Sequence, residues 1–167
     1  MPTRSEYYLD LAQWHPRTYK GLEIDAELKP VANSDIDALA DLMLNAYHGT
    51  IDYDDEGIED AIAEVQAYFD GERGGPPLAE FSRLAFRNDH LIAACLSARW
   101  DQREQPIIAY IMTRASEKRR GLARYLLTLV LSQLQNAGHS GVCAVITDGN
   151  AASERLFLGA GFRRLAA

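Results

Sequence analysis

The chain has 167 residues, of which 47% are hydrophobic and 25% charged, so it is long enough for one globular domain with a sizeable core. Its formal net charge of −7 argues against a nucleic-acid partner. No apolar stretch reaches the ~18 residues of a membrane-spanning helix, so no membrane partner is expected. The N-terminus lacks the apolar core of a signal peptide, and cysteine is scarce, which together favour a cytoplasmic protein.

Hydrophobic periodicity predicts the order of helices and strands. In the first part of the chain it predicts one strand, two helices and two strands, over residues 22–31, 36–47, 58–69, 81–87 and 91–100. In the second part it predicts a strand, a helix, a strand, a short helix and a last strand, over residues 106–113, 122–137, 142–147, 152–158 and from 161 onward. Between the first two helices lies an acidic loop bounded by glycines.

This order, β-α-α-β-β-β-α-β-α-β, combines a run of antiparallel strands with a β-α-β crossover. It predicts an α/β (α+β) fold with a mixed central sheet and helices on both faces. We expect a single domain over residues 21–167, preceded by an N-terminal extension over residues 1–20.

The basic turn before Gly121 is the most informative segment. It places Lys118, Arg119 and Arg120 directly before a helix N-terminus, where aligned peptide dipoles already leave about half a positive charge. Cations gathered there indicate a bound anion, because backbone N–H groups at a helix start bind phosphate and glycine permits close approach. The alternative is a basic turn that only faces solvent.

Two motifs together resemble the GNAT superfamily of acyl-CoA-dependent N-acyltransferases. The family's cofactor motif, Arg or Gln followed by x-x-Gly-x-Gly/Ala, is matched by Lys118, Gly121 and Ala123, with Lys in place of Arg or Gln. The family's downstream pattern is matched by Asn150, Ser153, Leu156, Phe157 and Gly161-Phe162. The resemblance is sharp over residues 107–162, and over residues 22–100 it rests on element order alone.

The resemblance implies acetyl-CoA as co-substrate, with no metal. It implies that the turn and the first amides of the following helix hold the pyrophosphate, that a strand edge bonds the pantetheine arm, and that Asn150 contacts this arm. Asn150 as a helix cap is the alternative. The cofactor-binding residues expected from this are Ile111, Met112, Thr113, Lys118, Arg119, Arg120, Gly121, Leu122, Ala123, Arg124, Asn150, Ser153 and Phe157.

The residue that activates the amine is left open by the sequence. Many members of the family carry a glutamate on the strand before the turn, but Ile107 stands near that position here. A carboxylate from elsewhere is therefore expected to act as the base. The candidates are Asp101 and Glu104 in the turn before the strand, and Asp52, Asp54, Asp55 and Glu56 in the acidic loop.

The proton donor to the leaving thiolate is also open. The family's usual general acid is a tyrosine, and Phe157 at this position cannot donate a proton. One alternative is that the thiolate leaves unprotonated, which its pKa of about 8.5 permits. Another is that Ser153 or Tyr110 donates instead, and a third is that the protein binds acyl-CoA without turnover.

We therefore expect an N-acetyltransferase that moves an acetyl group from acetyl-CoA to a primary amine of a small molecule or peptide. The alternative is a catalytically weak or inactive acyl-CoA-binding regulatory protein of the same fold. The resemblance also implies two strands after the short helix, whereas only five residues follow Phe162. Either the segment Glu6–Trp14 or a second subunit would then cover the sheet edge, and the second case favours a homodimer.

Overall fold

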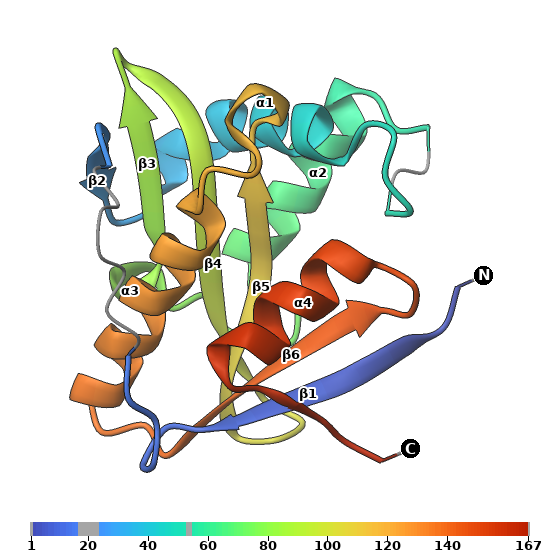
Figure 1. Cartoon of the computed structure of the whole chain (residues 1–167). Coiled ribbons are helices and arrows are strands. Elements are labelled where there is room, and N and C mark those ends of the chain that lie inside the picture. The colour runs from blue at the N-terminus through green and yellow to red at the C-terminus, as the bar shows by residue number, and fades with distance from the viewer. Residues whose placement is uncertain (1, 17–23, 53–54, 167) are drawn as a thin grey trace.

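The computed structural model describes residues 2–16, 24–52 and 55–166. In these residues seven strands form one sheet in the order β2-β3-β4-β5-β6-β1-β7, and four α-helices pack against it (Figure 1). The strands are β1 (Arg4–Asp10), β2 (Glu27–Lys29), β3 (Arg83–Arg87), β4 (His90–Trp100), β5 (Gln105–Thr113), β6 (Gly141–Thr147) and β7 (Arg163–Arg164). The helices are α1 (Ile36–Tyr47), α2 (Ile58–Phe69), α3 (Leu122–Asn136) and α4 (Ala151–Ala160).

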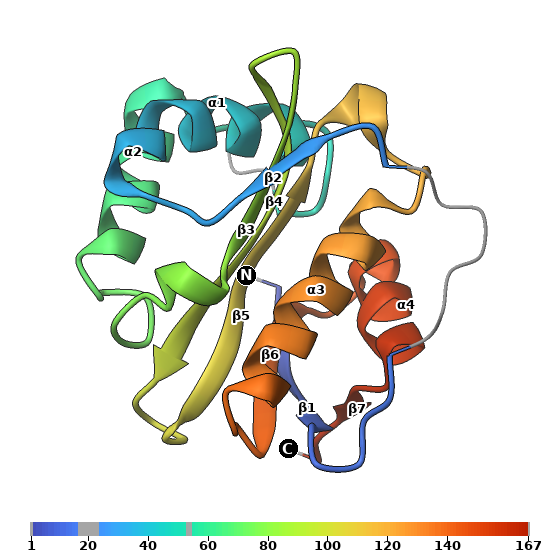
Figure 2. The ribbon, with the colours of Figure 1, turned by 90° about the vertical axis from the view of Figure 1, so that its left-hand side faces the viewer.

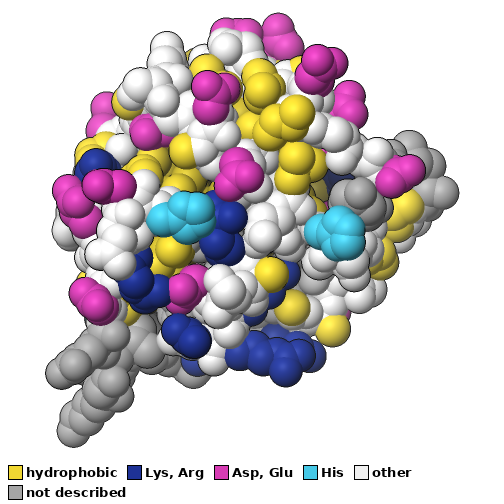
Figure 3. Space-filling model, turned by 90° about the horizontal axis from the view of Figure 1, so that it is seen from above, with side chains coloured by type: hydrophobic (Ala, Val, Ile, Leu, Met, Phe, Trp, Pro, Cys, Tyr) yellow, Lys and Arg dark blue, Asp and Glu magenta, His cyan; other side chains and the backbone are white. Residues whose placement is uncertain are grey.

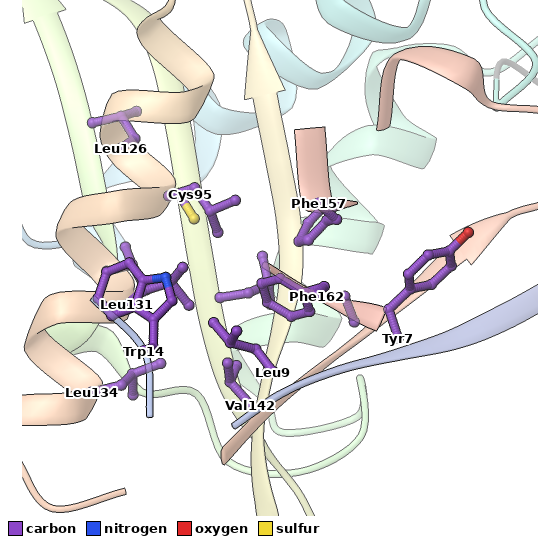
Figure 4. Close-up of a cluster of buried hydrophobic side chains, with 14 of the residues drawn as sticks. Tyr7, Leu9, Trp14, Cys95, Leu126, Leu131, Leu134, Val142, Phe157 and Phe162 are labelled. Atoms are coloured by element: carbon purple, nitrogen blue, oxygen red, sulfur yellow. The ribbon is translucent and has the colours of Figure 1, made fainter. Parts of the chain in front are cut away.

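The sheet separates two hydrophobic cores, which confirms the predicted mixed sheet with helices on both faces. Helices α1 and α2 cover one face and α3 and α4 the other (Figure 2). Most of the apolar stripe of α3 is fully buried, and Figure 4 shows its Leu126, Leu131 and Leu134 on the same core as Val142 and Phe162. No helix among the described residues is long and apolar enough to cross a membrane.

Strand β1 was not predicted as a strand, and it lies within the sheet. It pairs antiparallel with β6 from Arg4↔Thr147 to Asp10↔Gly141, and with β7 at Tyr7↔Arg164. The N-terminal segment was one of the two candidates for covering the sheet edge. It does so as a strand inserted between β6 and β7. Because this place is filled from the same chain, the missing strand no longer argues for a second subunit.

Alternation of side chains explains why this short segment pairs so firmly. Tyr7 and Leu9 point into the core of α3 and α4 and are 3% and 5% exposed. The chain then turns, buries Leu11 completely, and the Trp14 indole N–H donates a hydrogen bond of 3.0 Å to the Ala160 carbonyl at the end of α4. The segment therefore fastens both β6 and α4.

Two other elements differ from their predicted bounds. Strand β2 covers only the later part of the predicted strand 22–31, whose residues 22 and 23 lie outside the described residues. Helix α4 is longer than the predicted 152–158, because Asn150 caps its first turn and Gly161, with φ of 109°, ends it.

We expect Leu11→Ala to lower the free energy of unfolding by about 3 kcal/mol, since it empties a fully buried site between the N-terminal segment and the rest of the core. The matched control is Leu158→Ala on α4, where the side chain is 52% exposed and the change should stay within about 0.5 kcal/mol. Urea unfolding followed by circular dichroism measures both. Equal midpoints for the two variants would contradict the integral role of this segment.

Candidate active site

The two central parallel strands separate in the middle of the sheet. Strands β5 and β6 pair only at Ile107↔Cys143 and Ile108↔Ala144, within segments that the structure describes completely. Beyond these pairs β5 continues to Thr113 along β4, and β6 continues to Thr147 along β1 (Figure 1). The side of β5 that faces β6 thus lacks a strand partner over residues 109–113, and its backbone polar groups can accept a ligand there.

The basic turn lies where β5 ends. A short 3₁₀ turn leads from β5 into residues 118–121, in which Arg119 and Gly121 have positive φ values of 68° and 79°. The first hydrogen bond of α3 runs from the Tyr125 N–H to the Gly121 carbonyl at 3.0 Å. The amides of Leu122 and Ala123 precede that bond and point out of the helix start. Such a run of backbone N–H groups is an anion-binding arrangement.

The side chains of the basic cluster divide into different roles. The Lys118 ammonium donates a hydrogen bond of 2.7 Å to the Ala46 carbonyl, so it caps the C-terminal end of α1, where the helix dipole favours a cation. Arg119 is exposed, and the exposed guanidinium of Arg120 lies 3.5 Å from a carboxylate oxygen of Glu117. Surface pairs of this kind contribute little, so Arg120 can turn toward an anion.

Seen from above, the face that carries this turn is divided by charge. Lys and Arg side chains gather on the side of α3 and α4, and Asp and Glu side chains dominate the side of α1 and α2 (Figure 3). A ligand that enters between β5 and β6 therefore meets positive charge at one end and negative charge at the other.

The remaining residues expected to bind the cofactor fall into three environments. Ile111, Met112 and Thr113 lie on the separated part of β5, with Met112 buried in the core of α1 and α2. Phe157 is buried and packs edge to face on Phe162, with ring centroids 5.0 Å apart. Its side chain thus belongs to the core of α3 and α4.

Asn150 has both of its side-chain polar atoms engaged. Its Oδ1 accepts the Ser153 N–H at 3.1 Å, which is the helix-cap alternative, and its Nδ2 donates to Asp52 at 2.9 Å. The Thr147 hydroxyl donates to the other oxygen of Asp52 at 2.7 Å. Asp52 of the acidic loop is therefore tied to the end of β6 and the start of α4. Asp54 lies outside the described residues.

Asp101 and Glu104 lie at the other end of β5. The turn that contains them precedes this strand, whereas the basic turn follows it, and nine extended residues span roughly 30 Å. Asp101 is exposed and lies 3.6 Å from the Arg99 guanidinium. The structure does not bring these two carboxylates together with the basic turn.

Tyr110 does lie in the separated part of β5, and its hydroxyl donates a hydrogen bond to Glu64 of α2. Arg73 donates hydrogen bonds to both oxygens of the same carboxylate, from Nε to Oε1 at 2.8 Å and from Nη2 to Oε2 at 2.6 Å. The hydrogen bond from Arg73 holds the pKa of Glu64 below its usual value, against the opposing effect of burial. Burial and the neighbouring Glu64 raise the pKa of Tyr110, so its phenol stays protonated.

Sequence reasoning missed Glu64, because a polar residue on an amphipathic helix gives no separate signal. It stands beside the buried stripe of Ala61, Val65 and Tyr68, at the flank where α2 meets the sheet. Nearby, burial raises the pKa of Tyr47, with a further contribution from the negative charges of Asp52, Glu64 and Glu56. Carboxylates therefore dominate the field on this side of the opening. No cluster of potential metal-binding side chains occurs in the part of the chain that the structure describes.

Separated central strands beside a helix start with outward-pointing N–H groups define a class of α/β protein with an opening suited to a long, phosphorylated ligand. The Acetyltransferase (GNAT) family profile matches residues 38–162, which is more than half of the chain. The chain therefore belongs to the GNAT acetyltransferase family, as its motifs predicted. No curated protein matches the sequence closely enough to count as a relative.

Solved structures of GNAT acetyltransferases share the fold. A GCN5-related N-acetyltransferase of Sphaerobacter thermophilus is 19% identical with a TM-score of 0.71, over 99% of this chain and 50% of that one. The ribosomal-protein-S18-alanine N-acetyltransferase of Escherichia coli is 18% identical with a TM-score of 0.64, over 84% and 79%. A diaminobutyrate acetyltransferase of Paenibacillus lautus, solved with L-2,4-diaminobutyric acid and coenzyme A, is 18% identical with a TM-score of 0.59, over 83% and 75%. The chain thus spans only half the length of the Sphaerobacter thermophilus protein.

We expect Gly121→Ala to destabilise the fold by about 1–2 kcal/mol, because a side chain is strained at a φ of 79°, and also to weaken binding of coenzyme A. Gly138→Ala is the matched control: its φ is 91°, its added Cβ would meet no atom within 4 Å, and it follows the opposite end of α3. Gly138→Ala should lower the free energy of unfolding by a similar amount and keep its affinity for coenzyme A. Thermal unfolding and isothermal titration calorimetry separate the two effects, and equal affinity in both variants would contradict a role for the turn in binding.

Proposed function

We propose that this protein is an acyl-CoA-dependent N-acetyltransferase that transfers an acetyl group from acetyl-CoA to a primary amine by direct attack on the thioester. The observation that carries the proposal is the opening between β5 and β6 with the basic turn at the end of β5. An unpaired strand edge suits the amides of a pantetheine arm, and a helix start with positive-φ residues suits a diphosphate. Membership of the GNAT family supports the same reaction class.

In this proposal the amides of residues 122–124 hold the diphosphate, and Arg119 and Arg120 supply positive charge around it. The backbone of Ile111 to Thr113 binds the pantetheine arm as an added strand would. Lys118 and Asn150 support the site from outside the ligand, since Lys118 caps α1 and Asn150 joins Asp52 to the start of α4. The thioester then lies deeper in the opening, toward the point where the two strands meet.

The acceptor enters from the side of α1 and α2. An amine with a pKa near 10.4 must lose a proton before it attacks, which costs roughly 4 kcal/mol at neutral pH. Asp52 and Glu64 on this side attract the ammonium form and favour a cationic acceptor. The departing thiolate needs no general acid to be a tolerable leaving group, because its pKa is about 8.5.

A second candidate function is an acyl-CoA-binding protein with weak or no turnover. The specific observation in its favour is Phe157, which occupies the position of the family's usual tyrosine and is buried against Phe162. Loss of a general acid typically slows catalysis by about 10²–10⁴-fold, so a slow enzyme and a silent one are both compatible with this residue.

We expect acetyl-CoA to raise the melting temperature, and the double variant Arg119→Glu/Arg120→Glu to lose this shift, because two cations at the diphosphate become anions. The control with the same charge change is Arg99→Glu/Arg103→Glu, at the opposite end of β5, where both side chains are more than half exposed. Differential scanning fluorimetry with and without acetyl-CoA measures the shift. Loss of the melting shift in both double variants would mean that the net charge of the protein, and not this turn, controls the binding of acetyl-CoA.

We also expect release of free thiol from acetyl-CoA above background when amines are supplied, because the proposed site joins an activated thioester to an acidic acceptor side. The panel should contain diamines, amino acids, aminoglycosides and peptides with free N-termini. A thiol-reactive dye gives the rate, and mass spectrometry of the acceptor confirms an added acetyl group. Silence over the whole panel with acetyl-CoA binding intact would favour the regulatory function.

A further inference from the structure

The Tyr110 hydroxyl already uses its one hydrogen in a hydrogen bond. Tyr110 projects from the separated part of β5 toward α2, where its hydroxyl donates to Glu64 Oε1. A phenol that donates its one hydrogen keeps its oxygen lone pairs as acceptors. Glu64 orients this oxygen, and Tyr110 is half-buried on the part of β5 that has no β6 partner, where a ligand in the opening would lie. The oxygen can accept a hydrogen from an amine, and donation to a thiolate would first require that the bond to Glu64 break.

Glu64 is held in one position by partners on several sides. Arg73, from the turn after α2, fixes both of its oxygens, and Tyr110 approaches Oε1. The positive charge of Arg4 in β1 helps to lower the pKa of Glu64. The negative charge of Glu64 in turn helps to raise the pKa of Tyr47 at the end of α1. These partners keep Glu64 ionised and aimed at Tyr110.

Among the residues that the structure describes, a few other charged and titratable groups lie around the pair. The Tyr68 ring packs edge to face on the Tyr110 ring, with centroids 6.1 Å apart, and its own hydroxyl donates to the Ser97 carbonyl at 2.6 Å. Asp52 and Glu56 lie close enough to Tyr47 to help raise its pKa, as Glu64 does. Tyr110 is thus the group of this cluster that lies on the strand lining the opening, and Glu64 reaches the opening through it.

We propose that Tyr110 and Glu64 relay the proton that leaves the attacking amine, a role that rests on the proposed function. As the nitrogen of the already neutral amine bonds to the carbonyl carbon, it passes a proton to the Tyr110 oxygen, and the hydroxyl proton of Tyr110 passes to Glu64. The carbon–sulfur bond then breaks, and coenzyme A leaves as the thiolate with the electron pair. At the end Tyr110 is neutral and Glu64 is protonated. Glu64 then returns its proton through Tyr110 to water in the opening.

In this relay Tyr110 is the catalytic residue, Glu64 accepts the proton through it, and Arg73 is a positioning residue. Arg73 sets how readily Glu64 takes a proton, because its hydrogen bonds favour the ionised carboxylate. Removing Arg73 raises the pKa of Glu64. The carboxylate then becomes protonated at higher pH, and the relay stops working at a higher pH than in the unmodified protein.

The test is steady-state kinetics on the full chain with acetyl-CoA and a responsive amine, over a range of pH. We expect Tyr110→Phe and Glu64→Gln each to lower kcat by about 10²–10⁴-fold with the KM for acetyl-CoA unchanged. The double variant should be no slower than the worse single variant, because the two groups act as one unit. Glu59→Gln, also on α2 and exposed in its first turn, is the control and should keep its activity.

Arg73→Met supplies a readout that a merely structural role would not give. We expect the acidic limb of its kcat/KM profile to move to higher pH, whereas a packing defect would lower the rate at all pH values alike. Should Glu64→Gln fail to fold, as judged by loss of the melting shift with acetyl-CoA, Tyr110→Phe decides, since it keeps the ring and removes only the hydroxyl.

The outcomes separate the relay from the reaction itself. Turnover that survives in Tyr110→Phe, or single effects that multiply in the double variant, overturns the relay and leaves the acetyltransferase function standing. Absence of turnover in the unmodified chain, with acetyl-CoA still bound, overturns both.

Discussion

The separation of β5 from β6 is the constraint on which the rest of the structure depends. A backbone edge in the middle of a sheet is costly unless its N–H and C=O groups find partners. Here each strand is secured on its other side, β5 by β4 and β6 by β1, so the opening persists without unravelling the sheet. The empty edge of residues 109–113 is thereby kept for water or a ligand.

Two further features follow from this opening. Because β5 ends at Thr113, the basic turn and the start of α3 necessarily lie at its mouth. Because β6 loses β5 as a partner beyond Ala144, it relies on β1 over the rest of its length. The N-terminal segment, far from the basic turn in sequence, is therefore a condition for the shape of the candidate site.

The sequence predicted local features well and distant contacts poorly. Periodicity located the helices and the central strands. The cations before Gly121, unfavourable at a helix start, drew attention to the turn that the structure places at the end of β5. Tyr7 and Leu9 of β1 alternate with more exposed residues, but nothing in this pattern indicates that the partners of the strand are β6 and β7. Glu64 and Tyr110 stand 46 positions apart, and only the packing of α2 on the sheet joins them. Asp101 and Glu104 were candidates because they adjoin β5 in sequence. They precede the strand, however, and the basic turn follows it, so the length of β5 separates them from that turn.

The position of β1 also has a kinetic consequence. Arg4 pairs with Thr147, so β1 finds its neighbours only after β6 and β7, which come much later in the sequence, have been synthesised. Until then its apolar side chains have no sheet to join, and contacts of such long sequence separation form slowly. During synthesis this segment therefore stays unpaired for a long time, and an unpaired strand can mispair with another strand edge.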